Sequence, residues 1–175
     1  PLRRQRQMCI RDSLKAMPKV LQTHPDIHLT IAGDGPLKPK LKELAVNLGI
    51  VDRIDFLGMM EQTKLPDLYR WAALAVFPFI ATKSGVQEGF GLVVLEAMGC
   101  NCPVIAGDLP AIHDSIVHEK RGLLVDLGNS ENLAGAILRV LQDKDLCLRM
   151  AEMARKYVLE HYDWEVVVEK YAGLY

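Results

Sequence analysis

The chain has 175 residues, of which 50% are hydrophobic and 25% are charged. This composition excludes a disordered or collagen-like protein and is typical of one globular α/β domain. A formal net charge of −1 gives no general attraction to nucleic acid, so we expect no nucleic-acid partner. The longest apolar run, residues 72–81, is too short to cross a bilayer, and four scattered cysteines favour a reducing, cytoplasmic location over a disulfide framework.

From Leu14 onward the sequence alternates short apolar strands with helices that carry an apolar stripe. Strands are expected at residues 29–33, 54–58, 74–79, 103–107 and 122–126. Helices are expected at residues 37–48, 91–99, 133–141, 146–157 and 164–175, the last with Asp163 as its N-cap. Short apolar strands are typical of parallel sheets covered on both faces. Because parallel neighbours need a helical crossover, this order predicts an α/β fold with an open, doubly wound sheet.

The first thirteen residues differ from the rest of the chain. Four of them are basic, namely Arg3, Arg4, Arg6 and Arg11. A basic arm could bind phosphate or anionic lipid, but residues 3–13 also resemble, at every position, the in-frame translation of a transposon-type sequencing adapter. We therefore expect residues 1–13 to be non-native and residues 14–175 to come from a gene truncated at its 5′ end. Pro18 is expected to kink the helix around residues 14–24, the tail of a longer one.

Two glycine-rich turns follow predicted strands. Gly33 and Gly35 lie where a dinucleotide-binding fingerprint would lie, but Lys38 occupies the position of its third glycine, so a tight turn is the favoured interpretation. The second turn runs from Glu88 to Gly91 and leads into a helix, whose N-terminus could hold a phosphate by its backbone N–H groups and its dipole.

The spacing of two glutamates adds a second feature to this turn. If the helix begins near Gly91, Glu96 faces the crevice that Glu88 borders from the loop. A carboxylate there can accept two hydrogen bonds from a sugar diol. The alternative, which the residues alone leave open, is that Glu88 complements the helix dipole and Glu96 is solvated.

The two glutamates resemble the paired-glutamate signature of family 4 of the retaining glycosyltransferases, the group 1 glycosyl transferases with the GT-B fold. Other segments resemble this family in the expected order, at residues 30–36, 52–58, 96–100, 103–106 and 122–125. The resemblance implies that residues 14–175 are a Rossmann-like domain, the nucleotide-sugar-binding C-terminal half of a GT-B enzyme. It also implies a doubly wound order of 3-2-1-4-5-6 with the first, central strand missing, so the strands beginning near Leu29 and Leu74 should flank a gap.

The resemblance also assigns roles to residues. Glu96 is expected to bind the ribose hydroxyls, and Glu88 to contact the donor sugar as the catalytic residue. The other expected donor-binding residues are Gly33 and Gly35 in the cleft wall, Gly58 and Met59 near the base, and Gly89, Phe90, Gly91 and Leu92 at the sugar and diphosphate. The arginine and lysine that clamp the diphosphate in the family would fall within residues 1–13, so no residue is assigned to the clamp. His113 and Asp114 are not assigned a role either.

In function, the resemblance implies a retaining, metal-independent hexosyltransferase that uses a nucleotide-diphosphate sugar and no cofactor. The acceptor, a glycan, lipid or small molecule, would be bound by a missing N-terminal domain, and a lipid acceptor would bring the full-length enzyme to the membrane periphery. Alone, the fragment is expected to be inactive. Two alternatives remain open, namely a nucleotide-binding module without turnover and a GT-B-type sugar-nucleotide epimerase.

Three further patterns are assigned structural rather than chemical roles, and no metal site is expected. Cys100 and Cys102 lack the second pair that a zinc site needs. The Asp143-Lys144-Asp145 pattern of metal-dependent glycosyltransferases lies between two helices, where capping is the better explanation. Aromatic residues near the C-terminus recur at helical spacing and indicate packing rather than a platform for ring stacking; they are Tyr157, Tyr162, Trp164 and Tyr171.

Overall fold

The computed structural model describes residues 2–78, 91–127 and 129–173. The strands are β1 (Leu29–Ala32), β2 (Ile54–Gly58), β3 (Ala75–Phe77), β4 (Val104–Gly107) and β5 (Leu123–Val125), so each predicted strand is present within its predicted range. The helices are α1 (Leu2–Thr23), α2 (Lys38–Asn47), α3 (Leu65–Trp71), α4 (Leu92–Gly99), α5 (Ser130–Gln142), α6 (Lys144–Tyr162) and α7 (Trp164–Ala172). Short 3₁₀ helices are η1 (Val51–Arg53), η2 (Gln62–Lys64) and η3 (Pro110–Ile112). None of the helices in the described ranges has the length and hydropathy needed to cross a membrane.

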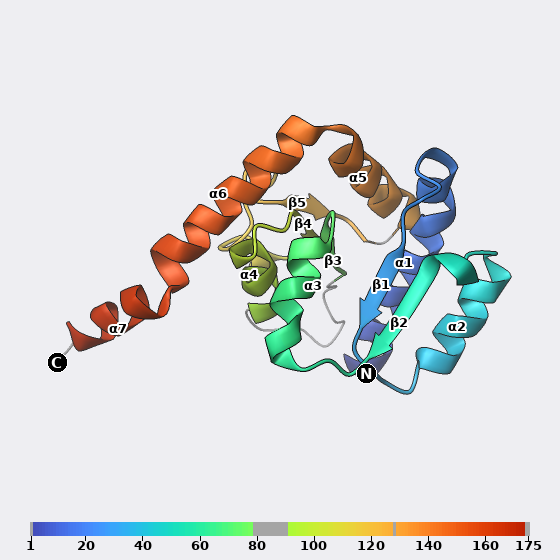
Figure 1. Cartoon of the computed structure of the whole chain (residues 1–175), viewed down its shortest axis with the longest axis horizontal. Helices are drawn as coiled ribbons and strands as arrows, with labels where there is room; N and C mark the ends of the chain where they lie inside the picture. Colours follow the sequence, from blue (N-terminus) through green and yellow to red (C-terminus); the bar gives the residue numbers. More distant parts are fainter. Residues whose placement is uncertain (1, 79–90, 128, 174–175) are drawn as a thin grey trace.

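All pairs among these strands are parallel, and they form two sheets (Figure 1). β1 pairs with β2, with Leu29 opposite Ile54, and β4 lies between β3 and β5. Parallel pairs joined by helices confirm the predicted α/β class. The expected gap is also present, since in the described part of the chain β1 pairs only with β2 and β3 only with β4. The order β2-β1, a break, and β3-β4-β5 matches a doubly wound sheet without its central strand.

The three-stranded sheet is covered on both faces. Ile105 of β4 packs in one cluster with Leu133 of α5. Its neighbour Val104 packs in the opposite cluster with Met98 of α4 and Ala154 of α6. Because successive residues of a strand face opposite sides of the sheet, this arrangement explains why all four residues of β4 are buried and apolar or small.

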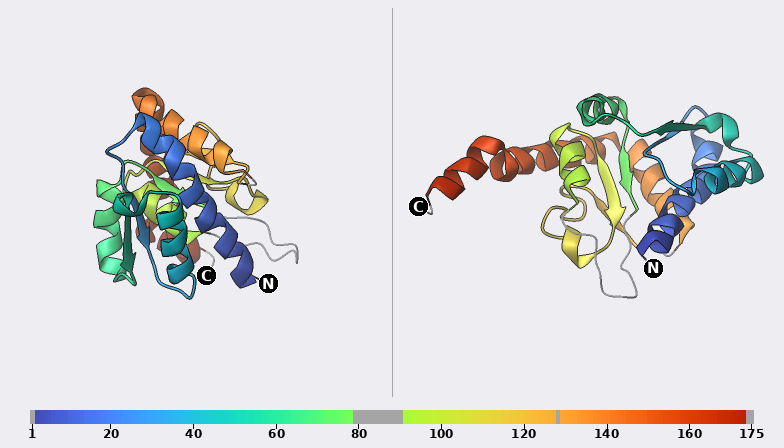
Figure 2. Two further views of the ribbon diagram at one scale, coloured as in Figure 1. Left: turned by 90° about the vertical axis from the view of Figure 1, so that its right-hand side faces the viewer. Right: turned by 90° about the horizontal axis from the view of Figure 1, so that it is seen from below.

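Helix α1 joins the two sheets. Leu14 and Met17 belong to the core of the β1–β2 sheet, whereas Ala16 and Val20 belong to the core that includes Ile105 of the β3–β5 sheet. Leu14 and Val20 are both 0% exposed. The helix contacts α2 on one side and α5 on the other, and Figure 2 shows α1 and α5 side by side.

Helix α1 is longer than predicted, and the kink expected at Pro18 stays a prediction. It continues through the boundary expected at residue 14, and Ile10 packs against the same cluster as Leu14. Pro18 lies inside the helix without ending it. A proline removes one backbone hydrogen bond, but Met17 and Val20 on either side of it are buried and hold the helix in place.

Gly122 precedes β5 at a position where a side chain has no room. Its φ is +156°, and a Cβ atom there would lie 2.7 Å from Val104 Cγ2 and 2.9 Å from the Val104 carbonyl oxygen. We therefore expect Gly122→Ala to lower the free energy of unfolding by about 1 to 3 kcal/mol. Gly135→Ala is the matched control, because Gly135 lies in α5 with open space at its Cβ position, and it should raise that free energy by about 0.5 to 1 kcal/mol. Urea unfolding followed by circular dichroism measures both changes, and equal effects of the two substitutions would contradict the tight packing at Gly122.

Candidate functional site

The first glycine-rich turn joins β1 to α2 and lies against the end of β2. The Gly33 amide donates a hydrogen bond to the Gly58 carbonyl, 2.7 Å away, and both residues have positive φ angles, 122° and 72°. Asp34 Oδ1 accepts a hydrogen bond from the Gly35 amide at 2.7 Å, and Asp34 Oδ2 lies 3.4 Å from Lys38 Nζ. This network confirms the tight turn and brings Gly33, Gly35 and Gly58 together.

Lys38 has no role in the sequence prediction, yet its ammonium group lies beside both Asp34 and Gly58. A Cβ atom at Gly58 would be 3.4 Å from Lys38 Nζ. The hydrogen bond from Gly35, followed by the interaction with Lys38, lowers the pKa of Asp34, so this carboxyl stays ionised at neutral pH. The four-residue spacing of Asp34 and Lys38 at a helix start is the signal that could have indicated the pair.

The second turn leads into α4, which begins at Leu92 with Gly91 as its N-cap residue, as predicted. Glu96 lies in the second turn of this helix and is half-buried. Within the described residues its carboxylate makes no hydrogen bond and no ion pair. Because an ionised carboxylate can only accept hydrogen bonds, this position favours a ligand that brings hydroxyl or amide donors.

Glu96 lines a cleft of about 560 Å³ between α3, α4 and the junction of α6 with α7. Its apolar wall is formed by Leu65, Pro66, Leu92, Leu95, Val158 and Trp164. The side chains that bring polar groups to it are those of Gln62, Tyr69, Glu96, Cys100 and Tyr162. A volume of this order, with apolar walls and a few polar groups, is typical of small-molecule sites.

Tyr69 supplies a hydrogen-bond donor in the same cleft as Glu96. Burial, and then the negative charge of Glu96, raise the pKa of Tyr69 to about 12. Tyr69 therefore keeps its phenolic proton at neutral pH. Together with the amide group of Gln62, these side chains can recognise a ligand that carries both hydroxyl groups and a polar ring.

The predicted donor-binding residues fall into two groups. One group lies at the carboxyl ends of β1 and β2 and contains Gly33, Gly35, Gly58 and Met59, of which Met59 is 81% exposed. The group at α4 contains Gly91, Leu92 and Glu96. The remaining three residues, Glu88, Gly89 and Phe90, lie outside the described residues, so the expected meeting of Glu88 with Glu96 stays a prediction.

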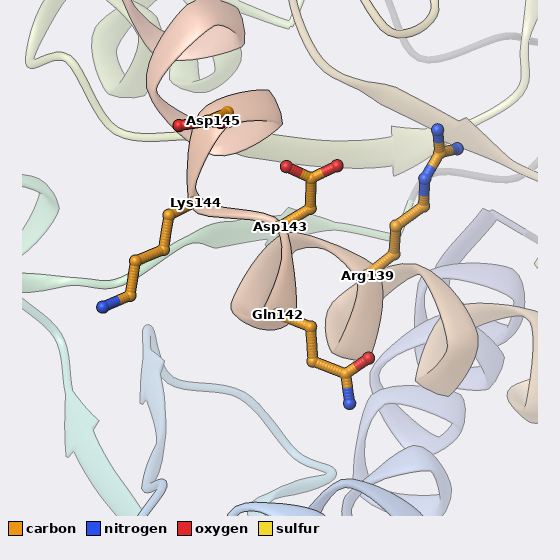
Figure 3. A pocket seen from close by; sticks show the side chains of 5 residues that line it. All are labelled: Arg139, Gln142, Asp143, Lys144 and Asp145. Carbon is orange, nitrogen blue, oxygen red and sulfur yellow. The ribbon is translucent and has the colours of Figure 1, made fainter.

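A second hollow, of about 470 Å³, lies at the junction of α5 with α6 and contains the Asp143-Lys144-Asp145 pattern. Asp143 Oδ1 accepts a hydrogen bond from the Leu146 amide at 2.9 Å, which confirms that Asp143 caps α6. Figure 3 shows the side chains of Arg139, Lys144 and Asp145 pointing in different directions. Across residues 2–78, 91–127 and 129–173, no group of three or more His, Cys, Asp or Glu side chains could hold a metal ion.

A family model described as glycosyl transferases group 1 matches residues 4–157. The chain belongs to the group 1 glycosyl transferases. The matched part begins within residues 1–13 and ends before α7. It contains the carboxyl ends of β1 and β2 and all of α4. The two groups of predicted donor-binding residues therefore both lie in the part of the chain that defines the group 1 glycosyl transferases.

Known glycosyltransferases match most of this group 1 chain. Uncharacterized glycosyltransferase MJ1607 of Methanocaldococcus jannaschii is 33% identical over 162 residues, which cover 93% of this chain and 40% of that protein. A GDP-mannose-dependent alpha-(1-6)-phosphatidylinositol monomannoside mannosyltransferase of Mycobacterium tuberculosis is 30% identical over 158 residues, 90% of this chain and 41% of that protein. The solved structure of sucrose-phosphate synthase from Thermosynechococcus elongatus has a TM-score of 0.80 at 26% identity and covers 98% of this chain and 42% of that one. The chain thus spans about two fifths of the length of these relatives.

The cap at Asp143 predicts the effect of its removal. Asp143→Ala should lower the free energy of unfolding by about 1 kcal/mol, because the Leu146 amide loses its acceptor. Asp145→Asn removes only a charge from the first turn of α6 and should cost roughly 0.3 kcal/mol. Thermal unfolding with and without Mn²⁺ measures both effects. A stabilisation by Mn²⁺ that Asp143→Ala abolishes would instead support metal binding at this pattern.

Proposed function

We propose that the chain forms the donor-binding half of a hexosyltransferase of family 4, which takes a nucleotide-diphosphate sugar and retains the anomeric configuration without a metal or another cofactor. The observation that carries this proposal is Glu96, a half-buried carboxylate with no hydrogen-bond partner in the described chain, on the wall of a cleft large enough for a nucleoside. A ribose diol would donate two hydrogen bonds to it. Each hydrogen bond to a charged group contributes about 1.5 to 3 kcal/mol.

The start of α4 supports a diphosphate site next to the ribose. Its N-cap residue is Gly91, which has no side chain to cap the helix. Backbone N–H groups at a helix N-terminus donate to phosphate oxygens, and the helix dipole favours the anion. We therefore assign the diphosphate to the backbone of Gly89, Phe90, Gly91 and Leu92. Glu88 is assigned to the transferred sugar as the catalytic residue.

The residues at the carboxyl ends of β1 and β2 would complete the donor site. Gly33 and Gly35 are exposed, so a ligand can approach their backbone closely. Gly58 and Met59 follow at the end of β2 and are assigned to the base. The ammonium group of Lys38 beside Gly58 adds a positive charge, which suits a donor that carries two phosphates.

Retention requires that the new bond forms on the face from which the old one leaves. The bond between the anomeric carbon and the phosphate oxygen breaks, and the acceptor oxygen bonds to that carbon on the same face. The acceptor proton passes to the leaving phosphate oxygen, so no protein base is needed at that face. The contribution of the protein is then electrostatic, from donors that are already oriented toward the diphosphate.

The partial coverage of the relatives supports the assignment of this chain to one domain of a longer enzyme. Residues 14–175 are assigned to donor binding and residues 1–13 to a non-native, adapter-derived segment. An N-terminal domain would bind the acceptor, which is a glycan, a lipid or a small molecule; a lipid would bring the enzyme to the membrane periphery. The name of the mycobacterial relative, a GDP-mannose-dependent enzyme, supports a nucleotide-linked hexose as donor. For the chain alone, the same coverage favours nucleotide binding without turnover.

In the full-length enzyme, the two glutamates should affect different kinetic constants. Glu96→Ala removes contacts to the ribose, which does not change during the reaction, so the donor KM should rise about ten- to a hundredfold with kcat nearly unchanged. Glu88→Gln removes a charge beside the reacting sugar, so kcat should fall by roughly the same factor. Steady-state kinetics, with calorimetry of nucleoside diphosphate binding, separates the two effects. Loss of nucleoside diphosphate binding in Glu88→Gln, with normal binding in Glu96→Ala, would show that the assigned roles are wrong.

Deletion of residues 1–13 tests the proposed boundary. The deletion should leave nucleotide affinity unchanged, because the assigned contacts all lie between Gly33 and Glu96. Leu14→Ala in the undeleted chain is a reference for damage to α1, since this side chain is 0% exposed, and it should lower the free energy of unfolding by about 2 to 5 kcal/mol. Calorimetric titration with UDP and GDP measures the affinity. A large loss of affinity on deletion, with the fold intact by circular dichroism, would make the segment part of the binding domain.

A further inference from the structure

We propose that Trp164 is a further ligand-binding residue of the cleft, and that its indole ring stacks on the base of the nucleotide whose ribose Glu96 binds. This inference rests on the proposed function. It extends that function to a residue of α7, which lies beyond the part of the chain matched by the family model.

The position of Trp164 contradicts the packing role predicted for it. Tyr157 and Tyr162 do pack against the core cluster of α4 and α6, as predicted, but Trp164 is 80% exposed. The physical reason is the direction of α7, which continues from the end of α6 away from both sheets (Figure 1). The indole therefore has no core to enter, and it lines the same cleft as Glu96 instead.

Exposure alone would not distinguish Trp164 from an ordinary surface residue. Trp71 is 90% exposed, yet it does not belong to the cleft lining. What distinguishes Trp164 is that it lines the same cleft as Glu96, a carboxylate without a hydrogen-bond partner in the described chain. A flat aromatic face beside an acceptor-only group matches a nucleoside, which has a flat base joined to a ribose diol.

The backbone around Trp164 is held on both sides. The carboxylate of Asp163 accepts a hydrogen bond from the Glu165 amide at 3.1 Å, and the Val167 amide donates to the Asp163 carbonyl at 2.9 Å. Asp163 thus caps α7, as the sequence predicted. Tyr162 lines the cleft as well, and burial raises its pKa to about 12, which keeps its phenol neutral. The indole is therefore presented from an ordered junction, and little order has to be gained on binding.

The other cleft residues fit the same ligand. Leu65 and Leu92 provide apolar walls for the ring edges, and the amide of Gln62 can both donate to and accept from the polar edge of a base. The base is distant from the bond that is transferred. Stacking should therefore stabilise ground state and transition state equally and change donor affinity rather than turnover.

The experiment uses the 175-residue chain, which contains two tryptophans, and two probes, UDP and GDP. Trp164→Leu removes the proposed stacking face, Trp164→Phe keeps a smaller one, and Trp71→Leu is the matched control at an exposed tryptophan outside the cleft. Each variant is first compared with the parent chain by circular dichroism. Calorimetry then gives the affinity, and tryptophan fluorescence reports which indole senses the nucleotide.

Both nucleotides should quench the fluorescence of the parent chain and of Trp71→Leu, but not that of Trp164→Leu. The affinity of Trp164→Leu should be roughly five- to a hundredfold weaker than that of the parent chain, with Trp164→Phe between them. If the parent chain and Trp164→Leu bind UDP and GDP equally well, this inference is overturned while the proposed function stands. If Glu96→Ala binds as tightly as the parent chain, or the parent chain binds neither nucleotide, the proposed function fails and the inference fails with it.

Discussion

The structure depends on one helix that packs on two sheets at once. Through Leu14 and Met17, α1 enters the core of β1–β2, and through Ala16 and Val20 it enters the core of β3–β5. In a continuous sheet a central strand would form hydrogen-bond ladders with both β1 and β3, whereas in the described chain the two sheets are joined by apolar packing through α1. Apolar burial has no preferred direction. Apolar packing therefore holds the sheets together but sets no register between them, whereas a hydrogen-bond ladder would set one.

This division matters for function because the assigned donor contacts come from both sheets. Gly33 and Gly58 lie at the ends of β1 and β2, whereas Glu96 lies on α4, which packs against β3 and β4. A donor that reaches both groups would add contacts across the break that the backbone does not make. Any ligand that binds only the folded state stabilises it by RT ln(1 + L/Kd), where L is the ligand concentration, so the stabilisation grows with that concentration. The donor would thus act as part of the connection between the two sheets.

The elements that the sequence predicts well are those in which one local pattern decides the structure. The five strands follow from short apolar runs, and the caps at Asp143 and Asp163 follow from one side chain and the amide two or three residues later. The cleft could not be predicted in this way, since its lining runs from Gln62 to Trp164 and comes from separate helices. Periodicity tells which residues share a helix face, but not which element that face meets. The exposure of Trp164 depends on the direction of α7, which no local pattern specifies.

The composition of the cleft bears on which ligand would suit it. Water can donate hydrogen bonds to Glu96, but it leaves Leu92 and Trp164 in contact with solvent, and these side chains are 64% and 80% exposed. A purely apolar ligand or partner surface would cover those side chains, yet it would leave the half-buried carboxylate without a hydrogen-bond donor, which is unfavourable. A ligand with a flat ring on one side and hydroxyl donors on the other satisfies both requirements. The nucleoside of the proposed nucleotide-sugar donor has this composition, so the proposed ligand and the chemistry of the cleft are compatible.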